Sequence, residues 1–396
     1  MLLANKKTLT NIVLNAIATI LPLAVLQVFV YPNVSRTLGD DSYALMLTIY
    51  SVWVLVSGTL AGAINSSKIV AYAEYVNNKL NGDYPLIIKK WLAITSVVCF
   101  VAIWYYLESF YLLHIVLGVI VSCLMFIQMY LECGFRIDID YKNLLINKIV
   151  LSIGYVIGYF LTYITKYWEF IFVFGYGLSI LFCMLKSSIK NEKSIKTILY
   201  KRTISDCYMY ATSNFISNAV NYADKLVLYP LIDSASLSIY YVSTLLGKVA
   251  STGASTIRDV LLSYLSKENK NDKKIFAIFV VAITCIVTLG YFVIVNIGKV
   301  LLAYLYPTLI SEVIIYLPIA TIISMLDVVA VIIHPFTLKY CSSKWQVLFS
   351  ASYGISYFIF SLVLWKMLGL KGFYYGGIIG QIIRIVLMLA IYFKKS

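Results

Sequence analysis

The segment Lys186–Asp206 has the sequence KSSIKNEKSIKTILYKRTISD and lies at the middle of the chain. It is the longest polar connector, and six apolar stretches lie on each side of it. A membrane-spanning helix needs about 20 mostly apolar residues, which each stretch approaches or exceeds. The predicted spans are 11–32, 43–66, 91–107, 111–133, 144–165, 168–185, 207–231, 236–257, 275–297, 312–333, 345–365 and 372–393.

The composition also indicates a membrane protein. The 396 residues are 61% hydrophobic and 13% charged, whereas soluble proteins carry about 25% charged residues. A transmembrane β-barrel is excluded because barrels have short alternating strands instead of continuous apolar runs. We therefore expect an all-α polytopic membrane protein with about 12 transmembrane helices in two six-helix bundles. The bundles are predicted at residues 1–190 and 207–396, with a cytoplasmic basic linker at 191–206.

Lysine and arginine are concentrated in every second connector. The connectors on the side of the N-terminus hold 23 of them, and those on the opposite side hold 5. Basic residues stay on the cytoplasmic side of a membrane, so both termini are predicted to be cytoplasmic. The net charge of +14 is then a property of one membrane face, and no nucleic-acid partner is expected.

No motif for a metal or a cofactor is present in the sequence. The seven cysteines are scattered without a CxxC spacing, and His114 and His334 are isolated. Buried thiols behave as small hydrophobic groups. Since there is also no nucleotide-binding loop, transport is expected to run on an ion gradient or on the substrate gradient.

The two halves of the chain are similar to each other. A shift of 198 residues superposes Tyr31-Pro32 on Tyr229-Pro230 and Tyr43 on Tyr241. In both halves the Tyr-Pro pair ends the first span and the later tyrosine opens the second. Parallel repeats of this kind occur in alternating-access transporters, whose substrate site lies between the repeats.

Three stretches resemble a known family. Tyr31–Gly39 (YPNVSRTLG), followed by Tyr43, is similar to the end of the first helix in bacterial polysaccharide flippases of the Wzx type. These belong to the MOP superfamily, which also holds the MATE drug exporters and the lipid II flippases. Asn221–Leu228 (NYADKLVL) resembles the seventh helix of the family, and Val300–Pro307 (VLLAYLYP) resembles its connector between helices nine and ten.

The resemblance implies a fold and a function. The implied fold is two six-helix bundles around a central cavity, in a bacterial cytoplasmic membrane. The implied activity moves an undecaprenyl-pyrophosphate-linked oligosaccharide from the inner to the outer leaflet, for O-antigen (lipopolysaccharide) or capsule synthesis. Expected partners are this substrate, membrane lipids, and polysaccharide polymerase and chain-length proteins. The chain departs from the family pattern at Lys225, where arginine is usual, and near Pro307, where glycine is usual.

Cations within the spans form the candidate substrate site. A charge deep in a bilayer is costly and normally faces a cavity or a partner. Lysine and arginine both bind phosphate oxygens, so deep cations suit a pyrophosphate. The candidates are Lys148, Lys225, Lys248 and Arg384, with Arg36 near the outer end of the first span. Lys148 either faces the cavity or extends to the membrane surface.

Other polar residues in the spans are candidates for a polar path or for coupling. Asp224 forms either an interhelical lock with Lys248 or a substrate contact. Arg384 either faces the cavity, which we favour, or is packed as the counter-ion of Asp327. Asn214, Asn218 and Asn221 recur at positions that share one face of a helix. That face suits either a hydrated sugar path or interhelical hydrogen bonds.

Three functions compete for these features. A flippase for lipid-linked oligosaccharide is favoured by the cation-rich spans. A MATE-like drug or cation antiporter of the same fold would be expected to have a cavity dominated by carboxylates. An enzyme, such as a membrane polysaccharide polymerase, would need a sizeable extramembrane loop, and the outward connectors are short. The chain is therefore predicted not to be an enzyme.

Overall fold

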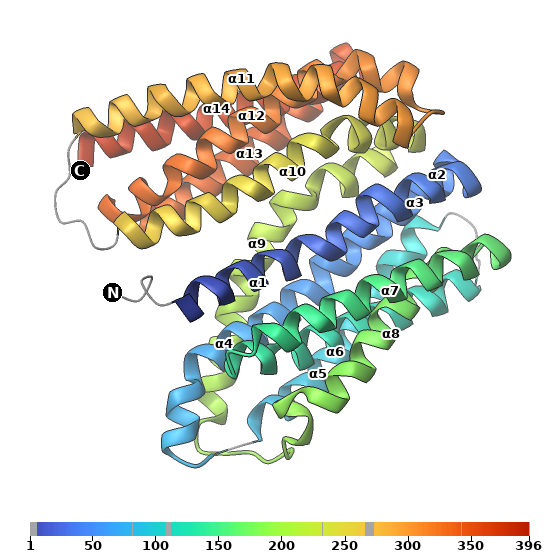
Figure 1. Ribbon diagram of the computed structural model, residues 1–396, viewed down its shortest axis with the longest axis vertical. Helices are drawn as coiled ribbons and strands as arrows, with labels where there is room; N and C mark the ends of the chain where they lie inside the picture. The colour runs from blue at the N-terminus through green and yellow to red at the C-terminus, as the bar shows by residue number, and fades with distance from the viewer. Residues whose placement is uncertain are drawn as a thin grey trace. The chain divides into compact units, whose positions relative to one another are not determined.

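Long helices make up nearly the whole of this protein. The computed structural model describes residues 6–80, 82–107, 112–231, 233–265, 273–341 and 343–395. Over these residues the chain forms twelve long helical rods and no strand (Figure 1). Each predicted span coincides with one rod. The prediction of an all-α polytopic membrane fold is confirmed.

The first two rods are each interrupted by a π-helical segment. The first rod consists of α1 (Lys6–Ala24), η2 (Val25–Val30) and α2 (Tyr31–Leu38), and the second of α3 (Asp40–Trp53), η3 (Val54–Gly58) and α4 (Thr59–Asn77). Pro22 lies inside α1 just before η2. Proline removes a backbone donor from the helical ladder, which explains a local change of winding there.

The remaining rods are single helices. They are α5 (Asp83–Tyr106), α6 (Leu112–Ile137), α7 (Tyr141–Thr165), α8 (Glu169–Lys186), α9 (Tyr200–Leu231), α10 (Ser234–Leu265), α11 (Lys273–Leu305), α12 (Ile310–Tyr340), α13 (Ser343–Leu368) and α14 (Leu370–Lys395). A short 3₁₀ turn, η4 (Ser188–Asn191), follows α8.

Ten of the rods, within the described residues, are long and apolar enough to cross a membrane. The two others are α9 and α10, which were also predicted as spans. Both carry polar side chains well inside the helix, for example Asn214 and Asn218 in α9 and Lys248 in α10. These side chains lower the mean hydropathy, although the helices are long enough to span a bilayer.

The packing of the helices divides the chain into two compact units, Met1–Ser234 and Ala235–Ser396. Helix α9 belongs to the first unit, where it packs against α4 and α3. The division by packing therefore falls after the seventh rod. The predicted bundles 1–190 and 207–396 with their linker at 191–206 describe the span pattern, and they stay a prediction.

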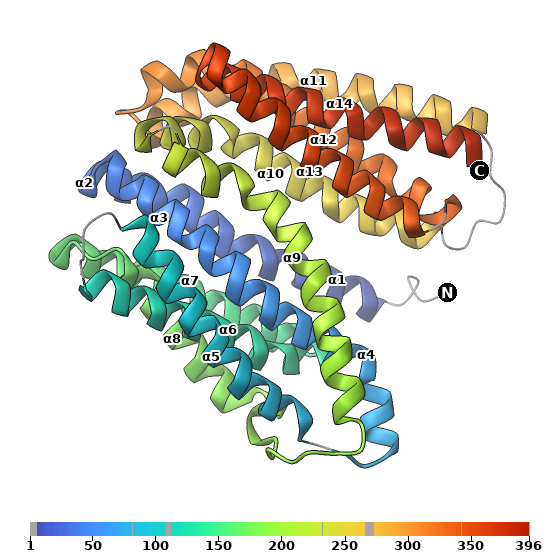
Figure 2. The ribbon, with the colours of Figure 1, turned by 180° about the vertical axis from the view of Figure 1, so that it is seen from behind.

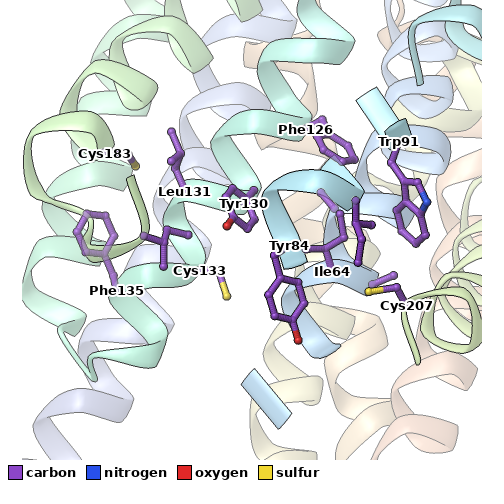
Figure 3. Packing of buried hydrophobic residues seen from close by; sticks show 14 of the residues in the cluster. Ile64, Tyr84, Trp91, Phe126, Tyr130, Leu131, Cys133, Phe135, Cys183 and Cys207 are labelled. Atoms are coloured by element: carbon purple, nitrogen blue, oxygen red, sulfur yellow. The ribbon is translucent and has the colours of Figure 1, made fainter. Parts of the chain in front are cut away.

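Aromatic and aliphatic side chains fill the core of the first unit. Figure 3 shows part of one cluster, in which Tyr84, Trp91, Phe126 and Tyr130 lie among buried aliphatic residues. Cys133, Cys183 and Cys207 are free thiols buried in the same cluster. These three cysteines pack as small apolar side chains.

The second unit is held together by close contact between α13 and α14. A Cβ atom at Gly376 would lie 2.3 Å from the backbone nitrogen of Ser361. Small residues let helices approach to this distance inside a membrane. The exterior of this unit is apolar, as on α11, where Ile278 and Val300 are 70% and 74% exposed. Such a surface suits contact with lipid chains rather than with water.

Candidate functional site

Arg384 and Asp327 face each other across α14 and α12. The Arg384 Nη1 donates to Asp327 Oδ1 at 3.0 Å, and Gln381 Nε2 donates to the same oxygen at 3.1 Å. The Tyr353 ring of α13 lies 5.4 Å from the guanidinium carbon. The Arg384 and Asp327 side chains keep 18% and 28% exposure. Of the two alternatives for Arg384, the structure therefore displays the counter-ion arrangement, with part of the guanidinium still accessible.

Lys248 lies in α10, next to a point of contact with α12. Its neighbour Gly247 packs so closely on α12 that a Cβ atom would lie 2.0 Å from Ser324 Oγ. Ser324 and Asp327 are three residues apart and share one face of α12. The Lys248 ammonium lies over the Tyr241 ring at 5.1 Å from its centroid.

We call Asp327, Gln381 and Arg384 the unit 2 charge cluster. It carries one cation and one carboxylate, and Lys248 is a further cation within the helices of the same unit. Val328 and Val329, which follow Asp327 in α12, belong to a buried hydrophobic cluster. An anion entering such a low-dielectric region interacts with the cations more strongly than it would in water. The Arg384 guanidinium and the Lys248 ammonium are cations of the kind that bind anionic groups.

Lys148 lies in a second polar group, in the first unit. Its ammonium contacts Glu132 Oε2 at 2.5 Å, and Gln128 Nε2 donates to the same oxygen at 2.7 Å. Gln128 also donates to Ser179, whose hydroxyl donates to Asn147 at 2.8 Å. We call these five residues the unit 1 polar network. Lys148 is thus held by a carboxylate inside the protein.

Glu132 was not among the predicted site residues, although the sequence contains a signal for its pairing. Glu132 and Lys148 stand at similar sequence distances from the α6–α7 turn at 138–140. In antiparallel helices joined by a short turn, such residues lie at the same depth. Equal depth and opposite charge could have identified the pair.

The asparagines of α9 face α4. Asn218 Nδ2 donates to Thr59 Oγ1 at 3.0 Å, and the Asn214 amide nitrogen would lie 3.2 Å from a Cβ atom at Gly62. These contacts correspond to the alternative of interhelical hydrogen bonding. Asn221, Asp224 and Lys225 also lie in α9, but their side chains are outside the described residues. Their roles, including the pairing of Asp224 with Lys248, stay predictions.

Arg36 lies in the first unit, near the end of a rod. It is exposed near the end of α2, and the adjacent Ser35 hydroxyl donates to Asp40 at 2.8 Å. The short turn at Gly39, with φ of 85°, joins α2 to α3 at this point. The structure places Arg36 at the end of a rod, as the sequence predicted.

Sequence analysis missed two further contacts between ionisable side chains. His114 Nδ1 and the fully buried Glu169 Oε1 are 2.6 Å apart. At the other end of the first unit, Lys68 bonds Glu192 of the connector after α8. This second pair lines a cavity of about 340 Å³, together with Tyr72, Tyr84 and Ser188. Neither pair had a sequence signal, because the partners are 55 and 124 residues apart.

Metal ligands do not gather anywhere in the part of the chain that the structure describes. No group of three or more His, Cys, Asp or Glu residues there is arranged to hold a metal ion.

Known structures share this fold at low sequence identity. An inward-facing multidrug resistance MATE family transporter of the MOP superfamily aligns with a TM-score of 0.67 and 11% identity, over 95% of this chain and 99% of that one. The lipid II flippase MurJ in an inward closed conformation aligns with a TM-score of 0.67 and 16% identity, over 98% and 88%. A MOP superfamily transporter from Pyrococcus furiosus aligns with a TM-score of 0.59 and 11% identity, over 98% and 97%.

The sequence comparisons are negative: no protein-family model and no curated protein matches the chain. The structural likenesses show that the chain has the fold of MOP superfamily transporters. This agrees with the superfamily that the sequence resembled. The shared fold identifies neither the Wzx type nor the substrate.

Proposed function

We propose that this protein is a flippase that moves an undecaprenyl-pyrophosphate-linked oligosaccharide across the bacterial cytoplasmic membrane for surface polysaccharide synthesis. The observation that carries the proposal is the partly exposed Arg384 guanidinium beside Asp327, with Lys248 a second cation within the helices of the same unit. The fold supports a transporter, since proteins that share it include MATE transporters and a lipid II flippase.

The cations Arg384 and Lys248 favour an anionic substrate over the organic cations that a drug antiporter would carry. A pyrophosphate carries negative charge, which Arg384 can bind with two parallel hydrogen bonds and Lys248 as a point charge. In a site for organic cations, carboxylates would be expected to outnumber lysine and arginine. We retain the antiporter as the second candidate because multidrug MATE transporters share the fold.

An enzyme such as a polysaccharide polymerase is the least favoured function. Among the described residues, the helices are joined by short turns, apart from the connector between α8 and α9. We infer that the residues responsible for the activity lie in the membrane-spanning helices. Polymerase and chain-length proteins are proposed as partners in the same pathway.

The experiment separates a substrate contact from a structural ion pair. Three variants, Lys248→Gln, Arg384→Gln and the double variant Asp327→Asn/Arg384→Gln, are expressed in a strain lacking the gene. Surface polysaccharide and protein abundance are then measured. Lys366→Gln, which changes an exposed cation near the end of α13, is the matched control.

If Arg384 binds pyrophosphate, both variants that lack it lose export while their abundance stays normal. If the pair is only structural, the double variant restores export, because it leaves no unpaired carboxylate. Normal polysaccharide with altered drug resistance in the Lys248 and Arg384 variants would instead support the antiporter.

A further inference from the structure

The connector between α8 and α9 is fixed to the end of the first unit at two points. At the first, Glu192 accepts a hydrogen bond from Tyr130 at 2.7 Å and bonds the Lys68 ammonium. At the second, the backbone nitrogen of Thr197 donates to Asp83 Oδ1 at 2.7 Å. The side chains that make both attachments are buried or nearly so. The two attachments therefore fix the position of the connector across this end of the unit.

The residues beneath the connector are adapted to its close approach. Gly82 has φ of 132°, and a Cβ atom there would lie 2.6 Å from the carbonyl oxygen of Ile195. The Tyr75 hydroxyl donates to Asp83 at 2.6 Å. Burial, together with this hydrogen bond, raises the pKa of Tyr75, so that the hydroxyl stays protonated as a donor.

Several acidic groups of this region make contacts within the protein, whereas Asp138, in the turn after α6, is exposed. Asp83 is fully buried, and Glu192 bonds Lys68. Glu74 accepts a hydrogen bond from Arg202 at 2.9 Å, and Asp206 lies 3.9 Å from the same guanidinium group. Glu192 and Asp83, which hold the connector, thus have cationic or hydroxyl partners, and Asp138 is a carboxylate that stays exposed at this end.

The cations of the connector face outward instead. We call the exposed residues Lys186, Lys190, Lys193, Lys196 and Lys201 the basic strip. Two of them are partly oriented by the protein, since Lys190 donates to the carbonyl of Leu185 at 3.0 Å and the Lys196 ammonium lies 5.0 Å from the Tyr200 ring centroid. The strip is a surface of one sign of charge.

Two large apolar side chains stand exposed within the strip. Ile195 is 52% exposed and Ile198 is 85% exposed, although both lie outside the membrane spans. Apolar groups next to lysines are characteristic of surfaces that rest in the headgroup region of a bilayer. The connector starts directly at the end of α8, where the Ser187 hydroxyl donates to the Leu131 carbonyl of α6, so the strip begins at the ends of two spans.

We propose that the basic strip binds the phosphate headgroups of anionic phospholipids in the cytoplasmic leaflet, with Ile195 and Ile198 at the level of the headgroups. Clusters of four to eight cations next to a span attract anionic lipid, and each contributes about a fivefold change in affinity. The proposal depends on the predicted cytoplasmic side of the connector and does not depend on transport.

The test uses the full chain in nanodiscs that contain equal amounts of phosphatidylglycerol and phosphatidylethanolamine. Lipids retained by the protein after release from the disc are counted by native mass spectrometry. The strip variant is Lys190→Gln/Lys193→Gln/Lys196→Gln. The matched control is Lys299→Gln/Lys366→Gln/Lys371→Gln, which removes three exposed lysines predicted to lie on the opposite membrane side.

The wild type and the control are expected to retain phosphatidylglycerol in preference to phosphatidylethanolamine. In the strip variant, the ratio of retained phosphatidylglycerol to phosphatidylethanolamine should fall at least tenfold while the protein stays monodisperse and folded. An unchanged preference in the strip variant would overturn the proposal. A strip variant that loses activity in cells but keeps its lipid preference would assign the strip to an acidic protein partner, and would also overturn it.

Discussion

Charged side chains inside the helices of this protein meet carboxylates from a neighbouring helix. Lys148 contacts Glu132, and Arg384 contacts Asp327. The energetic reason is that an unpaired charge in a low-dielectric interior costs several kcal/mol. The two pairs differ in exposure, since Glu132 is only 6% exposed in its side chain and Asp327 is 28% exposed. The first pair is enclosed within the unit, whereas the second is partly accessible, as the proposed binding of a ligand requires.

We expect Lys148→Met to destabilise the protein by about 3–5 kcal/mol, because it leaves the buried Glu132 carboxylate without its cation. The free energy of unfolding in detergent micelles is the measurement. The double variant Glu132→Leu/Lys148→Met should recover most of the loss, since both charges are then absent. Lys142→Met, on the exposed side of the same helix, is the control. Equal stability of the single variant and the wild type would contradict the structural role.

Helix pairs in both units depend on residues without side chains at the points of closest approach. In the second unit the backbone of α13 occupies the space that a side chain at Gly376 would need. In the first unit Gly158 of α7 meets the backbone of α8 in the same way, with a Cβ atom 2.4 Å from the carbonyl oxygen of Phe170. These contacts set how the helices are rotated, and so determine which polar side chains face each other.

Gly376→Ala is expected to lower stability by about 1–3 kcal/mol, because the added methyl group overlaps backbone atoms that cannot move independently. The midpoint of thermal unfolding in detergent should fall accordingly. Gly177→Ala is the matched control within a helix, since nothing lies within 4 Å of a Cβ atom there. Its stability should be unchanged or slightly higher, in line with the helix propensity of alanine. Similar behaviour of the two variants would mean that close approach at Gly376 is not required.

At the scale of the chain, the first unit has one end rich in basic residues and one end with few of them, Arg36 and Lys166. The end of α4 and the connector at 187–199 lie together at the basic end (Figure 2), where Asp83 bonds Thr197. The turn at 138–140 lines the cavity at this end through Asp138. Lys79, Lys142 and the basic strip lie at this end. The opposite end holds Lys166, in the turn between α7 and α8. Consecutive spans run in opposite directions, so every second connector lies at the same end of the unit.

The charge distribution predicts which end is cytoplasmic. Alkaline phosphatase, which is active only after export, is fused after Arg202 in one strain and after Lys166 in another. We expect no activity from the first fusion and high activity from the second. The reverse pattern would invert the orientation of the protein and would place the basic strip on the outer surface.

The sequence alone determined the class, the spans and the positions of the rods. These are local properties, because a continuous apolar run inside a bilayer must satisfy its backbone hydrogen bonds within the segment and so becomes a helix. It also located the deep charged residues Lys148, Lys248, Asp327 and Arg384, since a charge in an apolar run is visible without any structure.

Only the tertiary structure decided which partners these charges have. The pairing of Lys148 with Glu132, of Lys68 with Glu192 and of Asp83 with Thr197 depends on how each helix is rotated and where the connector after α8 lies. Rotation is set by packing over whole helices, including the close approaches at Gly158 and Gly376. A sequence records the depth of a residue in the membrane but not the direction in which it points. The direction emerges only when the helices pack together.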